Sequence, residues 1–548
     1  MGKINIVALG GLNENGKNLY VVEVNNNILV FDCGIKYAAD KMYGIDYVVP
    51  DFKYLIENMS KIKGVFITHP HTENMGSLTD LIKVLPNISV YVSEFAKHIL
   101  EYECKEEDVV IKNLFVAQAN RKIDFGDFSV FPFSVTHSSP QTLGYCVNTS
   151  DGAIIYMADY LIDPTMSGHY NMDLGKLAYI GKQGVLCLMN ESVFSEKKGH
   201  TSPNHKLEGF FKTVIDRNKN RIIFSVIPLH ISTISEIFNA LKGKNRKIVL
   251  MGKELNTIIG MCIKEGYLDI SNNLIGDLTN LRDDNSIILV SNDREKPYSN
   301  LIRMVDGYDK FVKIEKTDTI CFADPSYDAY EEIVVKLMND IAFQSANIEF
   351  IPKDKSVRYH ASSEDIMLLI KLFNPVYYMP VKGEYRYMVG NASLAKNVNI
   401  NESNIILRGN GEVVSFENGK LLKSNNSVFV DDILIDGKSS KDVGELVLKD
   451  REMLGNNGII VISATLSKKN KEVVTGPEIV TRGFIYVKEN TIIIEEIKRR
   501  ALDIIKKNTN ERYADYSKIR NDVREIIGSY LFKETECKPV ILTVIQEI

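Results

Sequence analysis

The segment VFITHPHTENMG (65–76) decides the fold, because it places His69 and His71 just after a β-rich run. One residue separates the two histidines, so in an extended backbone both imidazoles lie on the same face and can reach one ion. We expect the strand to end at Thr68 and both histidines to project from the loop beyond it. The segment therefore predicts part of a metal site.

Two later residues complete this site. FSVTH (133–137) places His137 at a predicted strand end, and IIYMAD (154–159) does the same for Asp159. Three histidines and one aspartate suit a tetrahedral zinc ion. A single histidine is more often a hydrogen-bonded structural residue, but the four residues together, in this order, favour a metal. The remaining histidines fit no ligand motif, and we expect them to be structural or solvated: His98, His169, His200, His205 and His230.

The chain alternates β-rich and helical segments in three blocks. Short strands fill the first 160 residues, with helices expected at 76–85 and 94–103. Helices alternating with buried strands from about 205 to 355 indicate an inserted α/β unit. Residues 364–405 then resemble a return to the first domain, with a helix (DIMLLIKLF) and a strand (VYYMPV).

The polar stretch around 409–427 is the best linker candidate. A C-terminal unit follows, with two amphipathic helices and a closing strand, KPVILTVIQEI. The first helix has Ile494, Ile497, Ala501, Ile504 and Ile505 on one face, and the second has Ile519, Val523, Ile526, Ile527 and Tyr530. Such a unit is either plain core or a dimerisation surface.

Composition describes an ordinary globular protein. The 548 residues are 45% hydrophobic and 25% charged, with a net charge of -5, and this length predicts about three domains. A nucleic-acid partner would need a locally positive channel. The seven cysteines form no C-x-x-C pair, and no apolar run is long enough for a membrane span. We expect a cytoplasmic protein.

Longer motifs resemble one family. GGLNENGKNLYVVEV (10–24), FDCGIKY (31–37), THSSPQTLGY (136–145), MPVKGEYR (379–386) and GPEIVTRGFIYV (476–487) are similar to segments of the ribonuclease J family. The resemblance covers nearly the whole chain and is weakest at 205–355. It implies a four-layer αββα metallo-β-lactamase fold (α/β class), with an inserted β-CASP α/β domain and a small α+β C-terminal domain. The domain scheme that follows is: metallo-β-lactamase 1–204 and 359–425, β-CASP 205–358, linker 426–445, C-terminal domain 446–548.

The departures from the family pattern concern the second metal. Family members have H-G-H-x-D-H, whereas this chain has Glu73 and Asn74 at the last two positions, and Lys382 replaces the histidine of PxHGEY. An amide is a poor zinc ligand and an ammonium is none. The resemblance thus implies one site, formed by His69, His71, His137 and Asp159, that holds one Zn²⁺ (or Mn²⁺) at most, or none. We hypothesise that Lys382 partly substitutes for the lost cation by neutralising Glu73 and Asp159. The alternative is a solvated surface lysine.

The substrate-binding motifs also differ. Glu191 in MNESVFSE takes the place of the family's β-CASP aspartate. The phosphate-binding loop HxSGH is replaced by Ser356, Val357, Arg358, Tyr359 and His360. The resemblance implies that His360 handles protons or contacts phosphate beside Asp159. VSNDREKP (290–297) lacks the glycines of a phosphate cradle, although Arg294, Lys296 and Arg358 could still meet phosphates; plain solvation is the alternative for each.

Three functions follow from these patterns. The first is a catalytically weak or inactive ribonuclease J-type subunit for rRNA processing and mRNA decay. It would bind RNA and an active paralogue, as a homodimer or heterotetramer joined through the C-terminal domain. The second is an active one-metal 5′–3′ exoribonuclease or endoribonuclease. The third is a small-molecule metallohydrolase, which the inserted and C-terminal domains disfavour.

Overall fold

A computed structural model gives the structure of most of the chain. It describes residues 2–38, 42, 44–270, 274–292, 297–323, 330–353, 355, 359–423, 425–437, 444–484, 491–510 and 513–548. The chain divides into two compact units, Met1–Tyr37 with Tyr47–Ile433, and Ala38–Asp46 with Leu434–Ile548. Among the described helices, none combines the length and the apolar character that a membrane crossing requires.

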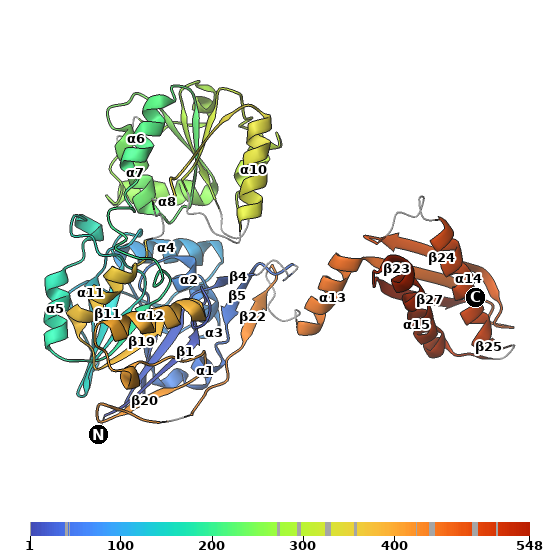
Figure 1. The fold of residues 1–548 in the computed structure, drawn as a ribbon, viewed down its shortest axis with the longest axis horizontal. Coiled ribbons are helices and arrows are strands. Elements are labelled where there is room, and N and C mark those ends of the chain that lie inside the picture. The colour runs from blue at the N-terminus through green and yellow to red at the C-terminus, as the bar shows by residue number, and fades with distance from the viewer. Residues whose placement is uncertain are drawn as a thin grey trace. The chain divides into compact units, whose positions relative to one another are not determined.

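The first unit contains two facing sheets (Figure 1). The eight strands described for the first sheet run in the order β21 (Lys420–Leu421), β20 (Val414–Glu417), β1 (Lys3–Gly10), β2 (Leu19–Val24), β3 (Asn27–Phe31), β6 (Ile62–Phe66), β7 (Ser89–Val92) and β8 (Asn113–Val116). The six described for the second run in the order β19 (Tyr377–Val381), β13 (Val185–Glu191), β12 (Gly152–Met157), β11 (Leu143–Thr149), β10 (Ser129–Ser134) and β9 (Ile123–Asp124). A short antiparallel pair, β4 (Lys36–Tyr37) and β5 (Tyr47–Pro50), lies outside both.

Alternating side chains build four layers from these sheets. In β2, Leu19 and Val21 pack toward the helices, whereas Tyr20 and Val22 pack toward the second sheet. The helices on the outer face of the first sheet are α1 (Lys53–Glu57), α3 (Leu78–Val84) and α4 (Glu94–Glu106). Those on the outer face of the second sheet are α5 (Leu174–Lys182), α11 (Ser363–Phe373) and α12 (Tyr385–Asn397). The predicted αββα fold is confirmed.

The inserted domain lies between two adjacent strands, because β13 and β19 pair in parallel although the insertion separates them in the chain. Its five described strands are all parallel, in the order β15 (Ile248–Met251), β16 (Ile287–Ser291), β14 (Ile222–Val226), β17 (Thr319–Phe322) and β18 (Asn347–Phe350). Helices cover both faces, with α6 and α7 along one side in Figure 1 and α10 along the other. The helices are α6 (Glu208–Arg217), α7 (Ile231–Leu241), α8 (Lys253–Lys264), α9 (Ser299–Val305) and α10 (Glu331–Phe343).

A buried acid in this domain makes its stability depend on pH. Both carboxylate oxygens of Glu236 lie 3.1 Å from the Leu207 N–H. Burial, together with the charge of Glu208, raises the pKa of Glu236 to about 7. The folded chain therefore keeps a proton that the unfolded chain has lost, and stability falls as the pH rises from about 4.5 to 7. We expect Glu236→Gln to gain roughly 2 to 3 kcal/mol relative to the native chain between pH 5 and 8 in urea unfolding. A difference that does not change with pH would contradict this.

The C-terminal unit is a three-stranded sheet with helices on one face. Its described strands run in the order β24 (Val473–Arg482), β23 (Ile459–Leu466) and β27 (Val540–Glu547). The helices α14 (Thr491–Lys507) and α15 (Tyr516–Thr535) pack on this sheet. The predicted α14 face is confirmed in full, but Ile526 of α15 is 42% exposed and Leu531 is buried in its stead. The other described elements are α13 (Glu445–Asn457), β22 (Asp432–Ile435), β25 (Thr509–Asn510) and β26 (Tyr513–Ala514).

The linker expected around 409–427 is wrong in its central part. Residues 414–417 form β20, which pairs with β1 from Lys3↔Glu417 to Ile6↔Val414. Val414 and Phe416 are buried between the sheets. The polar residues around this strand lie in its turns, which gave the segment its linker-like composition.

Candidate metal and substrate site

The candidate ligands lie in loops beyond strand ends. β6 ends at Phe66, because the Thr68 N–H donates to Asp32 Oδ1 (2.8 Å) and not to a neighbouring strand. Likewise β10 ends at Ser134 and β12 at Met157. The expected strand ends at Thr68, His137 and Asp159 are therefore wrong by two or three residues. The short helix α2 (Thr72–Met75) begins directly after His71.

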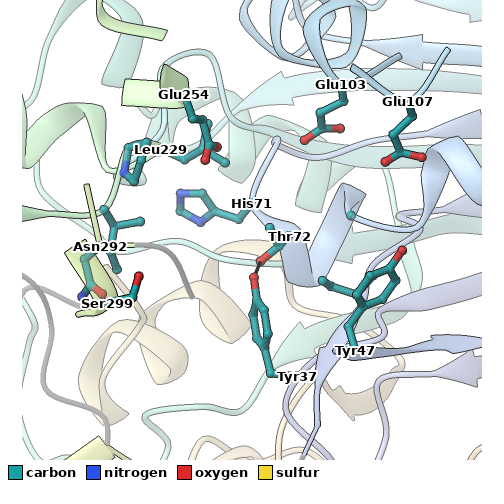
Figure 2. Close-up of a pocket in the computed structure, with 14 residues that line it drawn as sticks. Tyr37, Tyr47, His71, Thr72, Glu103, Glu107, Leu229, Glu254, Asn292 and Ser299 are labelled. Carbon is teal, nitrogen blue, oxygen red and sulfur yellow. Dashed lines mark hydrogen bonds between the residues drawn. The ribbon is translucent and has the colours of Figure 1, made fainter. Parts of the chain in front are cut away.

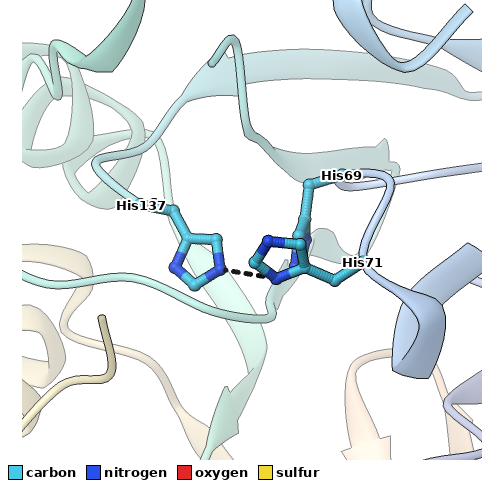
Figure 3. A group of neighbouring side chains, drawn as sticks. All are labelled: His69, His71 and His137. Atoms are coloured by element: carbon cyan, nitrogen blue, oxygen red, sulfur yellow. Dashed lines mark hydrogen bonds between the residues drawn. The ribbon is translucent and has the colours of Figure 1, made fainter. Parts of the chain in front are cut away.

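His69, His71 and His137 converge on one point (Figure 3). Their ring centroids lie 4.6 to 5.0 Å apart, and one nitrogen of each lies within 4.8 Å of those of the others. His137 Nε2 lies 3.2 Å from His71 Nδ1. All three side chains are buried. Three histidines that are far apart in the sequence are thus placed as one donor set.

Hydrogen bonds on the outer ring nitrogens orient this set. The Thr68 hydroxyl donates to Asp32, so its oxygen accepts from His69 Nδ1 (3.0 Å). His137 Nδ1 donates to the carbonyl oxygen of Tyr359 (2.9 Å). Both imidazoles therefore direct an Nε2 lone pair inward, and the buried Nε2 of His69 lies 3.2 Å from Asp159 Oδ2. This is the arrangement in which histidine binds a metal ion, so the three residues fit one cation.

Asp159 belongs to a second group, with Glu191 and His360. His360 Nδ1 lies 2.7 Å from Glu191 Oε2 and 3.2 Å from Asp159 Oδ1, and Asp159 Oδ2 lies 3.2 Å from His69 Nε2. Burial opposes protonation of His360, but the charges of Glu191 and Asp159 raise its pKa to about 9. Burial raises the pKa of Glu191, which also accepts from the backbone N–H of Tyr160 and Ala361.

Lys382 is a fully buried residue, not a solvated surface lysine. Its ammonium contacts Asp159 Oδ2 and donates to Asn74 Oδ1 (3.2 Å). Burial would lower the pKa of Lys382, but the charges of Asp159, Glu73 and Glu191 raise it. Burial likewise opposes ionisation of Asp159, yet Lys382 and His360 hold its pKa well below the usual range. The ammonium therefore occupies the space beside Asp159, and neither it nor the amide of Asn74 is a suitable metal ligand.

The structure reveals one site residue that the sequence did not indicate. His230, at the start of α7 in the inserted domain, has its ring 5.2 Å from that of His71. Two other histidines have structural partners, since His205 pairs with Asp163 and His200 with Asp365. His230 approaches the centre only through tertiary folding, so no spacing in the sequence could indicate it.

The residues predicted to bind phosphate are only partly described. Tyr359 is buried, and its ring packs against His205, with centroids 5.2 Å apart. His360 borders the centre, as described above. The other predicted residues lie outside the described residues: Ser356, Val357, Arg358, Arg294 and Lys296.

Two cavities reach the histidines. One of about 240 Å³ is lined by His71, His137, Ser138, His230 and His360, among others. A second, of about 400 Å³, runs from His71 to a wall that carries Glu103, Glu107 and Glu254 (Figure 2). Burial and the two neighbouring carboxylates raise the pKa of Glu103 well above its ordinary value. Glu107 on this wall is paired with Lys83, whose Nζ lies 2.7 Å from Glu107 Oε2.

Family models match three segments of the chain: the beta-lactamase superfamily domain at residues 27–175, the ribonuclease J beta-CASP domain at 219–341 and the ribonuclease J C-terminal domain at 446–548. Among similar proteins, "Ribonuclease J 2" of Staphylococcus saprophyticus is 32% identical over all of this chain and 98% of its own length. "Ribonuclease J 2" of Staphylococcus aureus matches with the same identity and coverage. The chain belongs to the ribonuclease J family.

Membership in the ribonuclease J family confirms the fold class inferred from the motifs. A crystal structure of a protein of unknown function from Enterococcus faecalis is similar in fold alone, with a TM-score of 0.53 and 16% identity over 76% of this chain and 100% of that chain. The metallo-β-lactamase fold implies a metal cofactor, for which the three-histidine group and the Asp159 group are the candidate sites. The relatives are named ribonucleases, which are enzymes that act on RNA.

Proposed function

We propose that this chain is a ribonuclease J-type protein of RNA processing and decay whose own centre is catalytically weak, and that it works in the cytoplasm as a subunit beside an active paralogue. One observation carries the proposal, namely the buried ammonium of Lys382 against Asp159. Two metals in such a centre clamp the attacking and leaving oxygens of a phosphodiester. With one Zn²⁺ or Mn²⁺ at most, the chain lacks half of that clamp.

The isolated chain would therefore cleave RNA weakly at its own centre. An active partner would supply the cleavage.

The C-terminal unit is the proposed association surface. Val461 of β23 lies between Val480 and Leu542 in the sheet register, and both of these side chains are 47% exposed. The three residues lie on the face opposite α14 and α15, because Ile460 and Ile462, which alternate with Val461, pack under the helices. A second chain that packed on this apolar strip would bury it from water, which would favour a homodimer or a heterotetramer with the paralogue.

A second candidate is an active one-metal 5′–3′ exoribonuclease. The converging lone pairs of the three histidines favour it, because a single bound zinc can lower the pKa of its water to about 7. A small-molecule metallohydrolase is disfavoured by the matched beta-CASP and C-terminal domains.

The isolated chain is expected to degrade 5′-monophosphorylated RNA on the order of a hundredfold more slowly than its active paralogue, with Mn²⁺ or Zn²⁺ present. Metal analysis of the same sample should find no more than one ion per chain. His69→Ala is the control for activity that depends on the centre. Rapid processive degradation that His69→Ala abolishes would support the second candidate, and two ions per chain would contradict both.

Association is measured separately. Gel filtration with light scattering should detect a complex of this chain with the active paralogue, and Leu542→Asp should weaken it without unfolding the chain. Persistence of the complex in that variant would exclude the proposed strip as the surface.

A further inference from the structure

The backbone around Lys382 is held in an unusual conformation. Lys382 has φ = 51°, a left-handed value that costs a non-glycine residue free energy. Its N–H donates to the Tyr20 hydroxyl (3.1 Å), and its carbonyl oxygen accepts from the Ser192 N–H (3.0 Å). Hydrogen bonds from both sheets thus fix the residue that carries the buried ammonium.

Asn74 is oriented toward this ammonium by Asp32. Asn74 Nδ2 donates to Asp32 Oδ2 (2.7 Å), so the amide oxygen is the atom that faces Lys382 Nζ. Asp32 also accepts from the Thr68 N–H (2.8 Å) and the Tyr156 hydroxyl (2.7 Å). A carboxylate only accepts, so the amide cannot turn its nitrogen toward Lys382 without losing its bond to Asp32.

We propose that Asp32 and Asn74 are positioning residues for Lys382, and that these three residues form a metal-free ammonium site that neutralises buried Asp159. Asp159 and Glu191 are both buried and share the single imidazole of His360, so a second cation is needed beside Asp159. In this chain that cation is the side-chain ammonium of Lys382. The inference rests on the proposed function only in placing the ammonium where family members have a second metal. The tests of this inference measure stability and not RNA cleavage. The inference can therefore fail while the proposed function holds, and the proposed function can fail while the inference holds.

Removing the ammonium of Lys382 should make the stability of the chain depend on a bound metal ion. Lys382→Met replaces the ammonium side chain by an apolar one that is one atom shorter, and it leaves Asp159, Glu191 and His360 as a group of possible ligands within 4.8 Å of one another. In EDTA we expect its Tm to fall by on the order of 10 °C. Added Mn²⁺ should restore at least half of that loss.

Two controls separate this effect from general destabilisation. Lys17 is also buried and paired, with Glu14 and Asp432. Lys17→Met should therefore lower the Tm without recovery in Mn²⁺. His71→Ala disrupts the three-histidine group at a residue outside the Asp159 group. If Mn²⁺ still restores the Tm of Lys382→Met/His71→Ala, the ion binds at the position that the ammonium has left. Loss of recovery in that double variant would overturn the proposal.

A double-mutant cycle tests the positioning role. Asn74→Leu removes the acceptor for Lys382, and its Tm loss should be at most half as large in the Lys382→Met background as in the native chain. Equal losses in both backgrounds would overturn the role of Asn74.

If Lys382→Met does not fold, Lys382→Met/Asp159→Asn decides the matter. Removing both charges should restore folding, because no buried carboxylate then lacks a partner. An unfolded double variant would overturn the proposal. So would a Lys382→Met protein as stable in EDTA as the native chain, or one that fails to recover in Mn²⁺.

Discussion

The variant Glu73→Asp, Asn74→His, Lys382→His is expected to cleave 5′-monophosphorylated RNA on the order of a hundredfold faster than the native chain. These substitutions restore the family's second-site residues and remove the ammonium that contacts Asp159. A second cation then becomes possible beside the first, and with it the clamp on both reacting oxygens. The measurement is the release of mononucleotides in Mn²⁺, together with the number of bound ions per chain.

The same variant with His71→Ala is the control, because it keeps the restored ligands but removes one imidazole of the first group. Its activity should return to the native level. Two bound ions without cleavage in the triple variant would mean that RNA does not reach the centre. The altered phosphate-binding loop would then be responsible.

Gly34→Ala is expected to destabilise the chain by on the order of 3 kcal/mol and to weaken metal binding by the histidines. A Cβ at residue 34 would lie 1.7 Å from the carbonyl oxygen of Glu73 and 2.8 Å from the Asn74 nitrogen. The backbone of the loop would have to move, and His71 with it. Thermal unfolding and zinc titration measure the two effects.

Gly209→Ala is the matched control. Gly209 lies in α6, and no atom lies within 4 Å of the position its Cβ would take. Its effect on stability should stay within about 1 kcal/mol. Near-native stability and zinc binding in Gly34→Ala would show that the loop tolerates displacement.

Local patterns predicted the strands and the identity of the clustered histidines. β1, β2 and β3 follow β-rich runs bounded by turn residues, and their largely apolar sequences fit strands that are buried on both faces. The pairing of β20 with β1 was missed because nearly the whole chain separates the two strands. A polar segment of four to eight residues contains no information about so distant a partner.

The chemistry at the centre was predictable only as a set of residue types. The motif comparison identified Glu73, Asn74 and Lys382 as departures from the family pattern. The sequence alone was equally compatible with a solvated surface lysine at position 382. Burial of Lys382 depends on Asn74 in helix α2 and on Asp159 in the loop after β12, and both are far from Lys382 in the sequence. The close packing of Gly34 against the Glu73 carbonyl and the approach of His230 to His71 also depend on tertiary contacts.

The hydrogen bond from His137 Nδ1 to the Tyr359 carbonyl has a consequence for dissecting the chain. The acceptor belongs to the polypeptide that returns after the inserted domain, so the tautomer of a ligand in the first segment is set by residues beyond position 350. A fragment that stops at residue 204 would contain all three imidazoles yet leave one of them free to rotate. We therefore expect such a fragment to bind metal more weakly than the full chain, because the orientation of His137 depends on residues that follow the inserted domain.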